Sequence, residues 1–130
     1  MTAVGFTGTR DGMSDAQRSA LRAELAGATE LHHGDCVGAD VEADSIAREL
    51  ELDVVVHPPS DSRLRAFCAR PGDVVWQPAP YLERNRDIVD STDRLVAAPR
   101  SDEEELRSGT WATVRYARKV GRPATVLARS

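Results

Sequence analysis

Short apolar segments alternate with amphipathic segments along the whole chain, and this alternation most constrains the fold. Apolar residues at helical spacing mark the amphipathic segments, for example Ala39, Ala43, Ile46, Ala47 and Leu50. The short apolar runs between them suit strands that are covered on both faces. Strands that alternate with helices are joined by right-handed crossovers into a mostly parallel sheet. We therefore expect a three-layer α/β fold with about five strands, built as one domain over residues 1–130.

Capping residues, glycines and prolines in the sequence predict where these strands and helices begin and end. The expected strands span residues 3–6, 30–33, 53–57, 94–98 and 124–128, and the expected helices span residues 14–27, 39–50, 81–91 and 110–120. Ser14 with Gln17 three residues later is a capping box, which favours a helix start. Residues 74–76 are a candidate for a short extra strand, and residues 101–104 for a short helical turn. The proline-punctuated segment 58–80 has no helical period, so we expect a long loop or lid there.

Three glycine-bearing turns lie between an expected strand and an expected helix, at residues 5–10, 33–40 and 108–110. In a parallel sheet such turns share the edge where the strands end, which is the edge that binds ligands. Glycine permits close approach, and the free N–H groups of a helix N-terminus bind anions. The sequence therefore predicts a pocket for a nucleotide or related phosphorylated molecule, and we expect neither a bound metal nor a separate cofactor.

The first and third turns carry small and hydroxyl-bearing residues. In the first turn, Gly8 permits close backbone approach, Thr9 offers a hydroxyl and Arg10 is a candidate for a phosphate contact. The alternative interpretation is an ordinary glycine turn with a surface arginine. The third turn offers a similar set, namely Ser108, Gly109 and Thr110.

The second turn is bracketed by Gly34 and Gly38 and carries acidic residues. Asp40 either holds ribose hydroxyls or complements the dipole of the helix that begins beside it, and Asp35 has the same ambiguity. Both are also candidates for a catalytic carboxylate, although no pattern identifies a catalytic residue. Asp40 and Asp44 at i, i+4 spacing would permit a metal, but a solvated acidic face explains them better.

Arg84 and Asn85, near the start of the helix expected at 81–91, are the remaining candidates for ligand contacts. Helical spacing sends Arg84 and Arg86 to different sides, so at most one of them faces a given ligand. Asn85 either reads the edge of a base or caps a turn. His32 and His33 have no partner at metal-ligand spacing, and we interpret them as ordinary histidines at the end of a strand.

Charge and cysteine usage exclude several classes of protein. The net charge is −4, whereas a sequence-independent nucleic-acid binder is more often basic, so a nucleic-acid partner is not expected. Cys36 and Cys68 form no CxxC pair, which argues against a disulfide scaffold or a zinc site. No signal peptide and no apolar run of membrane-spanning length are visible, so we expect a cytoplasmic location without membrane partners.

Taken in order, residues 8–10, 33–40, 84–86 and 108–110 resemble the motifs of the SLOG superfamily (Smf/DprA-LOG), and most closely its YspA/YpsA-related branch, DUF2493. The resemblance spans nearly the whole chain and implies a Rossmann-like fold that binds nucleotides or nucleotide-derived ligands. It implies phosphate-binding roles for Gly8, Arg10, Gly34, Gly38, Gly109 and Thr110, and contacts to ribose or base for Asp40, Arg84 and Asn85. Relatives often dimerise, which implies a homodimer or higher homo-oligomer.

The chain departs from the superfamily pattern at one position. Phosphoribohydrolase members carry PGGxGTxxE, and here Thr113 stands in the place of the glutamate. Threonine cannot act as a carboxylate base, so whether the protein is an enzyme stays open among three hypotheses. It is a sensor or carrier of a nucleotide-type ligand; or an N-glycoside hydrolase of a nucleoside monophosphate, with Asp35, Asp40 or Asp44 replacing the glutamate; or a single-stranded DNA-binding module like DprA.

Overall fold

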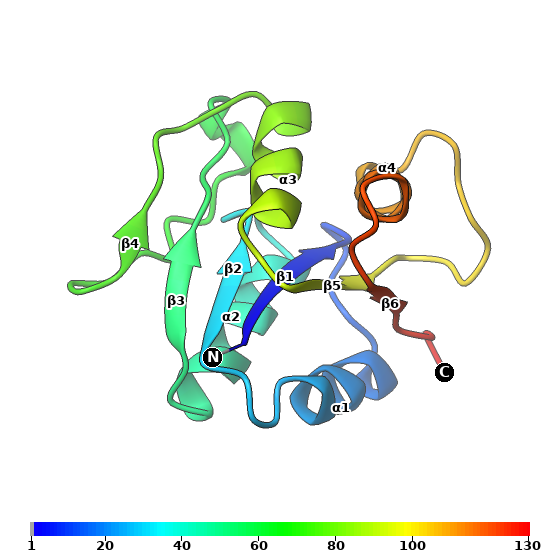
Figure 1. The fold of residues 1–130 in the computed structure, drawn as a ribbon, viewed down its shortest axis with the longest axis horizontal. Helices are drawn as coiled ribbons and strands as arrows, with labels where there is room; N and C mark the ends of the chain where they lie inside the picture. The colour runs from blue at the N-terminus through cyan, green and yellow to red at the C-terminus, as the bar shows by residue number, and fades with distance from the viewer. Residues whose placement is uncertain (1) are drawn as a thin grey trace.

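Six strands and four α-helices alternate along residues 2–130, the part of the chain that the computed structural model describes (Figure 1). The strands are β1 (Ala3–Gly8), β2 (Glu30–His33), β3 (Asp53–Val56), β4 (Val74–Val75), β5 (Arg94–Ala98) and β6 (Ala124–Val126). The α-helices are α1 (Asp15–Glu24), α2 (Ala39–Glu49), α3 (Tyr81–Asp90) and α4 (Gly109–Lys119), and a short 3-10 helix, η1, spans Ser62–Leu64.

All strands run parallel, in the order β4-β3-β2-β1-β5-β6. The chain order reverses at β1, where Gly5 lies opposite His32 of β2 on one side and Leu95 of β5 on the other. Parallel α/β sheets bind ligands outside the carboxyl ends of their strands at such a switch point. We therefore expect a ligand-binding site at the carboxyl ends of β1 and β5.

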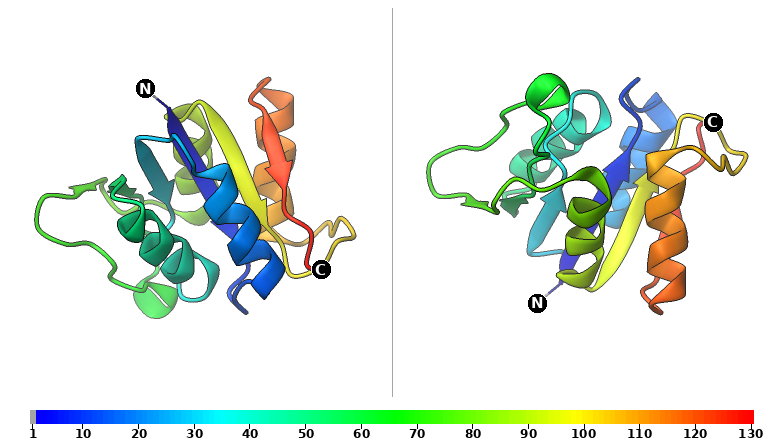
Figure 2. Two further views of the ribbon diagram at one scale, coloured as in Figure 1. Left: turned by 90° about the horizontal axis from the view of Figure 1, so that it is seen from below. Right: turned by 90° about the horizontal axis from the view of Figure 1, so that it is seen from above.

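Helices cover both faces of the sheet, which confirms the expected three-layer α/β fold (Figure 2). Side chains of β1 alternate between the two faces, because successive residues of a strand point in opposite directions. Val4 and Phe6 are fully buried in the core that α1 and α2 cover. Gly5 faces Ile88 of α3, beside the second core, to which α4 contributes Trp111.

The capping box at the start of α1 forms as the sequence predicts. The Ser14 side chain accepts a hydrogen bond from the Gln17 N–H, and the Ser14 N–H donates to Gln17 Oε1, both at 3.1 Å. Gln17 is itself fully buried, and its Nε2 donates to the carbonyls of Pro99 at 2.9 Å and Leu127 at 3.1 Å. A local capping residue thus also ties α1 to the chain beyond β5 and β6.

Val74 and Val75 form β4 beside Val55 and Val56 of β3, which confirms the candidate strand at residues 74–76 and gives the sheet six strands. One local feature differs from expectation, because the helical turn expected at residues 101–104 does not form. Instead, Ser101 Oγ accepts a hydrogen bond from the Glu103 N–H at 3.2 Å, which is a side-chain turn that competes with a helix start.

The long segment 58–80 lies against the body of the protein. The Ala66 N–H donates to the Asp35 carbonyl at 2.7 Å, and the Arg48 guanidinium of α2 binds the Asp73 carboxylate at 2.8 Å. The segment also contributes η1 and β4. It is therefore anchored at several points along its length.

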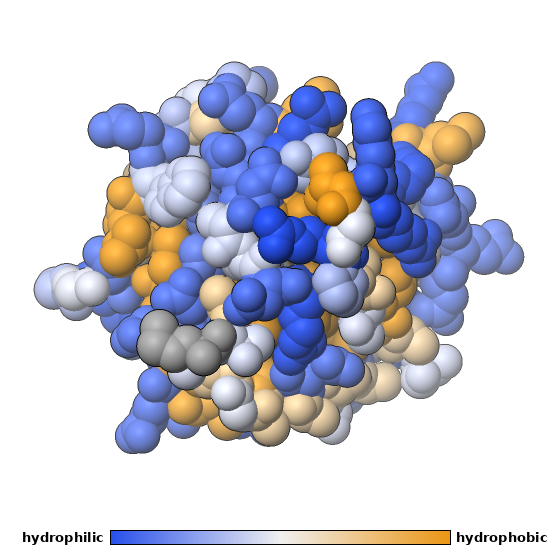
Figure 3. Space-filling model, viewed as in Figure 1, coloured by the Kyte–Doolittle hydropathy of each residue, from blue (hydrophilic) through white to orange (hydrophobic). Residues whose placement is uncertain are grey.

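The surface is mostly hydrophilic on the face shown in Figure 3, with hydrophobic side chains over β4, where Val74 and Val75 are exposed. Within residues 2–130, no helix is both long enough and apolar enough to cross a membrane.

Candidate ligand-binding site

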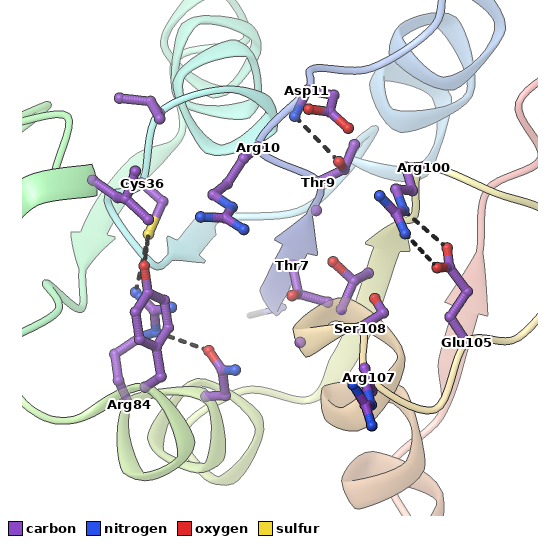
Figure 4. A pocket seen from close by; sticks show the side chains of 17 residues that line it. Thr7, Thr9, Arg10, Asp11, Cys36, Arg84, Arg100, Glu105, Arg107 and Ser108 are labelled. Carbon is purple, nitrogen blue, oxygen red and sulfur yellow. Dashed lines mark hydrogen bonds and ion pairs between the residues drawn. The ribbon is translucent and has the colours of Figure 1, made fainter.

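A cavity of about 660 Å³ opens where β1 and β5 end, at the switch point of the sheet. This volume is typical of sites for small molecules. Figure 4 shows how its side chains come from several elements that are far apart in the sequence. The lining residues are Thr7, Gly8, Thr9, Arg10, Asp11, Cys36, Val37, Leu64, Tyr81, Arg84, Asn85, Arg100, Glu105, Arg107, Ser108, Gly109 and Thr110.

The first glycine turn lies in the pocket. Arg10 is exposed at the end of β1, and its guanidinium has no hydrogen bond or ion pair with any residue in the range 2–130. Thr9 Oγ1 accepts a hydrogen bond from the Asp11 N–H at 3.2 Å, which leaves the hydroxyl hydrogen free to donate. A Cβ on Gly8 would approach the Cβ of Ala39 to 2.5 Å, so glycine here lets β1 pack against α2. The turn therefore supplies hydrogen-bond donors to the cavity, and close packing of β1 against α2 explains why residue 8 is glycine.

The second glycine turn is covered by the first. The Ala39 N–H at the start of α2 donates to the Thr9 carbonyl at 3.0 Å. Gly38 has a φ of 93°, and a Cβ there would collide with the Arg10 carbonyl. Gly34 packs against the Arg84 guanidinium. Neither Gly34 nor Gly38 lines the cavity, because the first turn occupies the N-terminus of α2.

Asp35 and Asp40 lie behind the pocket wall. Asp35 is fully buried, and its carboxylate accepts hydrogen bonds from Arg65 Nε at 2.9 Å and from the Cys68 N–H at 2.8 Å. Asp40 Oδ2 accepts from the Cys36 N–H at 3.1 Å, while Oδ1 is buried and has no hydrogen-bond partner in the described part of the chain. Burial raises the pKa of Asp40, although His33 and Arg84 oppose this effect. Both carboxylates shape the wall from behind and do not reach the cavity.

The third glycine turn opens onto the cavity at the N-terminus of α4. Ser108 is the N-cap, and its Oγ accepts from the Trp111 N–H at 3.2 Å. The N–H groups of Gly109 and Thr110 have no acceptor within residues 2–130, and the space in front of Gly109 is open. Arg107 lies beside them, also without a partner in that range. Together these donors suit an anion.

Thr113, the one departure expected from the superfamily pattern, takes no part in the cavity. It is buried, and its hydroxyl donates to the Gly109 carbonyl at 2.9 Å one turn earlier in α4.

Arg84 and its neighbours form the wall opposite the N-terminus of α4 (Figure 4). Arg84 is only 5% exposed, and its Nη1 donates to the Gly34 carbonyl. Its guanidinium lies 4.9 Å from the centroid of the Tyr81 ring, and the Tyr81 hydroxyl lies 3.7 Å from Cys36 Sγ. Arg84 Nε donates to Asn85 Oδ1 at 2.8 Å. Arg84 and Asn85 are thus brought together with the first and third turns.

Two carboxylates do line the cavity, and neither was singled out from the sequence. Asp11 is exposed, and its carboxylate has no partner in the described chain. Glu105 is bound by Arg100 through two hydrogen bonds, of 3.1 and 2.7 Å. From the sequence, residues 102–105 are interpreted as a solvated acidic run. The place of Glu105 in the chain that follows β5, beside the switch point, is the signal that could have identified it.

His33, Asp44 and Cys68 bring ligand-type atoms within 4.8 Å of one another. His33 and Asp44 are already engaged in hydrogen bonds, however. His33 Nδ1 accepts from the Asp35 N–H at 3.0 Å, so Nε2 carries the hydrogen that it donates to Asp44 at 2.9 Å. Arg48 binds the same carboxylate, and burial raises the pKa of the Cys68 thiol to about 12. This cluster is best explained as a buried hydrogen-bond network.

Comparison with known proteins gives a likeness of fold. No family model matches the chain, and no curated protein matches its sequence. The molybdenum cofactor binding protein of the phototrophic bacterium Rippkaea orientalis superposes with a TM-score of 0.72 at 20% identity, covering 96% of this chain and 75% of that one. The Moco carrier protein of Chlamydomonas reinhardtii gives 0.68 at 21%, covering 97% and 75%.

DNA processing protein A (DprA) of Streptococcus pneumoniae also matches, with a TM-score of 0.68 at 19% identity. The match covers 97% of this chain and 50% of DprA, so this chain spans half the length of that protein. Likeness at such identities concerns the fold alone. The protein shares with these proteins a Rossmann-like α/β fold, which here has an all-parallel sheet.

Proposed function

We propose that this protein binds a nucleotide or nucleotide-derived phosphorylated molecule in the cavity at the carboxyl edge of the sheet, as a carrier or sensor. One observation carries the proposal. Arg10 and Arg107 line the cavity without an acceptor in residues 2–130, and the unpaired N–H groups of Gly109 and Thr110 lie in the same cavity. Unpaired cations and helix N-terminal donors that share one cavity are typical of phosphate sites.

The two walls of the cavity differ in chemistry, which supports a ligand with two parts. The wall around the N-terminus of α4 offers N–H donors and Arg107, and it suits a phosphate. The opposite wall offers the Tyr81 ring together with the apolar side chains of Val37 and Leu64, and it suits a flat heterocycle. Because two structural neighbours are described as binding or carrying the molybdenum cofactor, that cofactor belongs among the ligands to test.

The test is a thermal-unfolding panel of AMP, IMP, ADP-ribose, NAD, cyclic nucleotides and the molybdenum cofactor. At a concentration of 100 times Kd, a true ligand adds about 2.7 kcal/mol to the free energy of unfolding. Arg107→Ala should weaken binding about tenfold or more, because hydrogen bonds to charged groups are worth about 1.5–3 kcal/mol.

The matched control is Arg63→Ala, which removes an exposed arginine that lies outside the cavity. It should leave affinity unchanged. Absence of stabilisation by every ligand of the panel, or equal affinity in wild type and Arg107→Ala, would contradict the proposal.

A second candidate function, N-glycoside hydrolysis, is favoured by one observation: Asp11 lines the cavity with a carboxylate that no residue in the range 2–130 binds. Of the carboxylates considered for this role from the sequence, Asp35, Asp40 and Asp44 are all buried and outside the cavity. The same panel, assayed for release of free base from wild type and Asp11→Asn, separates an enzyme from a carrier.

A further inference from the structure

The side chain of Arg84 is immobilised in the wall of the cavity. Its Nη1 donates to the Gly34 carbonyl and lies 3.5 Å from the His57 carbonyl and 3.7 Å from Cys36 Sγ. The Tyr81 ring covers its guanidinium at 4.9 Å, and only 5% of the residue is exposed. Its remaining donors therefore have fixed directions.

This arginine sets the orientation of the neighbouring carboxamide. Arg84 Nε donates to Asn85 Oδ1 at 2.8 Å. Because an arginine can only donate, the atom that it meets must be the oxygen of Asn85. The NH2 group of Asn85, which is half-buried in the cavity wall, then has two N–H donors that no residue between 2 and 130 accepts.

Around Asn85, the same wall offers a ligand little that can accept a hydrogen bond. Val37 and Leu64 are apolar, and the Tyr81 hydroxyl and Cys36 Sγ face each other at 3.7 Å. The carbonyls of Gly34 and His57 are near Arg84. In the part of the chain that the structure describes, the side-chain oxygens of this wall are the Tyr81 hydroxyl, which lies beside Cys36 Sγ, and Asn85 Oδ1, which already accepts from Arg84 Nε. The wall is apolar and aromatic, with donor hydrogens at Asn85.

From this geometry we infer that Asn85 selects the class of heterocycle: an oxo-substituted ring is preferred to one that carries an amino group in the same place. The inference rests on the proposed function and deepens it. A ring carbonyl accepts from the Asn85 NH2, whereas an exocyclic amino group places donor against donor and leaves both unpaired. Sites with such a mismatch discriminate strongly, because buried polar groups lose their partners.

Calorimetric titration of IMP and AMP tests the inference, because these two nucleotides differ in an oxo against an amino group on the purine. Wild type should bind IMP about tenfold or more tightly than AMP. Asn85→Asp keeps an oxygen for Arg84 Nε but replaces the two donors with a second acceptor. Its IMP-to-AMP affinity ratio should fall to about one or reverse, even if both affinities drop through charge repulsion.

Ribose 5-phosphate, which lacks a base, reports on the phosphate wall alone. If ribose 5-phosphate and both nucleotides bind but IMP and AMP bind equally, the inference is wrong and the proposed function stands. If the affinity ratio is the same in wild type and Asn85→Asp, the inference is also wrong. If none of the three ligands binds, the inference is wrong, while the proposed function is decided by the remaining ligands of the thermal-unfolding panel.

Unfolding midpoints of the variant without ligand show whether the wall is intact. Should Asn85→Asp not fold, Asn85→Ala takes its place, and it should abolish the preference for IMP. A preference that survives removal of the carboxamide would overturn the inference.

Discussion

His57 is a histidine held neutral inside the protein. It is 1% exposed, with Nε2 2.9 Å from His32 Nδ1 and its ring centroid 4.4 Å from that of Trp76. Nδ1 has no partner. Burial, reinforced by nearby His32, His33 and Arg84, lowers the pKa of His57 to about 3. The second proton, which makes the ring positively charged, therefore binds readily in the unfolded chain and much more weakly in the folded one.

The free energy of unfolding should consequently fall as the pH drops below about 6.5, where the unfolded histidine takes up a proton. The loss continues toward pH 3, at up to about 1.4 kcal/mol per pH unit from this residue. Denaturant unfolding of wild type and His57→Asn between pH 7 and pH 4.5 measures it. The variant should show the shallower decline, since the carboxylates titrate in both proteins. Parallel curves would contradict the prediction.

At the scale of elements, the N-termini of α2 and α4 follow similar glycine turns but have different surroundings. The N-terminus of α2 is covered by the Thr9 carbonyl, while that of α4 faces the cavity. The capping box of α1 involves residues three apart, so the sequence alone predicts it, and the Ser108 cap of α4 spans the same short distance in the chain. The contact between Thr9 and Ala39 joins residues 30 positions apart, and no local pattern encodes it.

Gly38→Ala should destabilise the protein by at least about 2 kcal/mol, because it combines a φ of 93° with a collision against the Arg10 carbonyl. Gly27→Ala is the matched control: its φ is 82°, but nothing lies within 4 Å of the added Cβ. It should cost only the backbone strain, about 1 kcal/mol. Chemical denaturation of both variants measures the difference, and equal losses would show that the close packing at Gly38 is unimportant.

At the scale of the whole molecule, buried charges join segment 58–80 to the rest of the fold. Arg48 of α2 binds both Asp44 and Asp73, and Asp35 binds Arg65. The sequence predicts the length and irregularity of this segment. Its anchoring depends on ion pairs between residues 25 and 30 positions apart, which composition and periodicity do not reveal.

Asp73→Ala should release the segment locally, because Arg48 loses one of its partners there and the Arg70 N–H loses its acceptor. Limited chymotrypsin digestion under native conditions should then cut after the exposed Phe67 several times faster than in wild type. Asp61→Ala, which removes the partner of Arg63 in the same segment, should change cleavage after Phe67 little. Equal rates after Phe67 in Asp73→Ala and wild type would show that the anchor is elsewhere.

The hydrogen bond from Ala39 to the Thr9 carbonyl also has a kinetic consequence. It fixes the backbone that carries Arg10 before any ligand arrives, so the cavity floor is already formed. Binding then carries no free-energy cost for ordering this loop, and closely related ligands should have similar association rate constants. Differences in their affinities would then come mainly from differences in residence time. The residence time depends on how well each ligand satisfies hydrogen-bond donors whose backbone positions were fixed during folding.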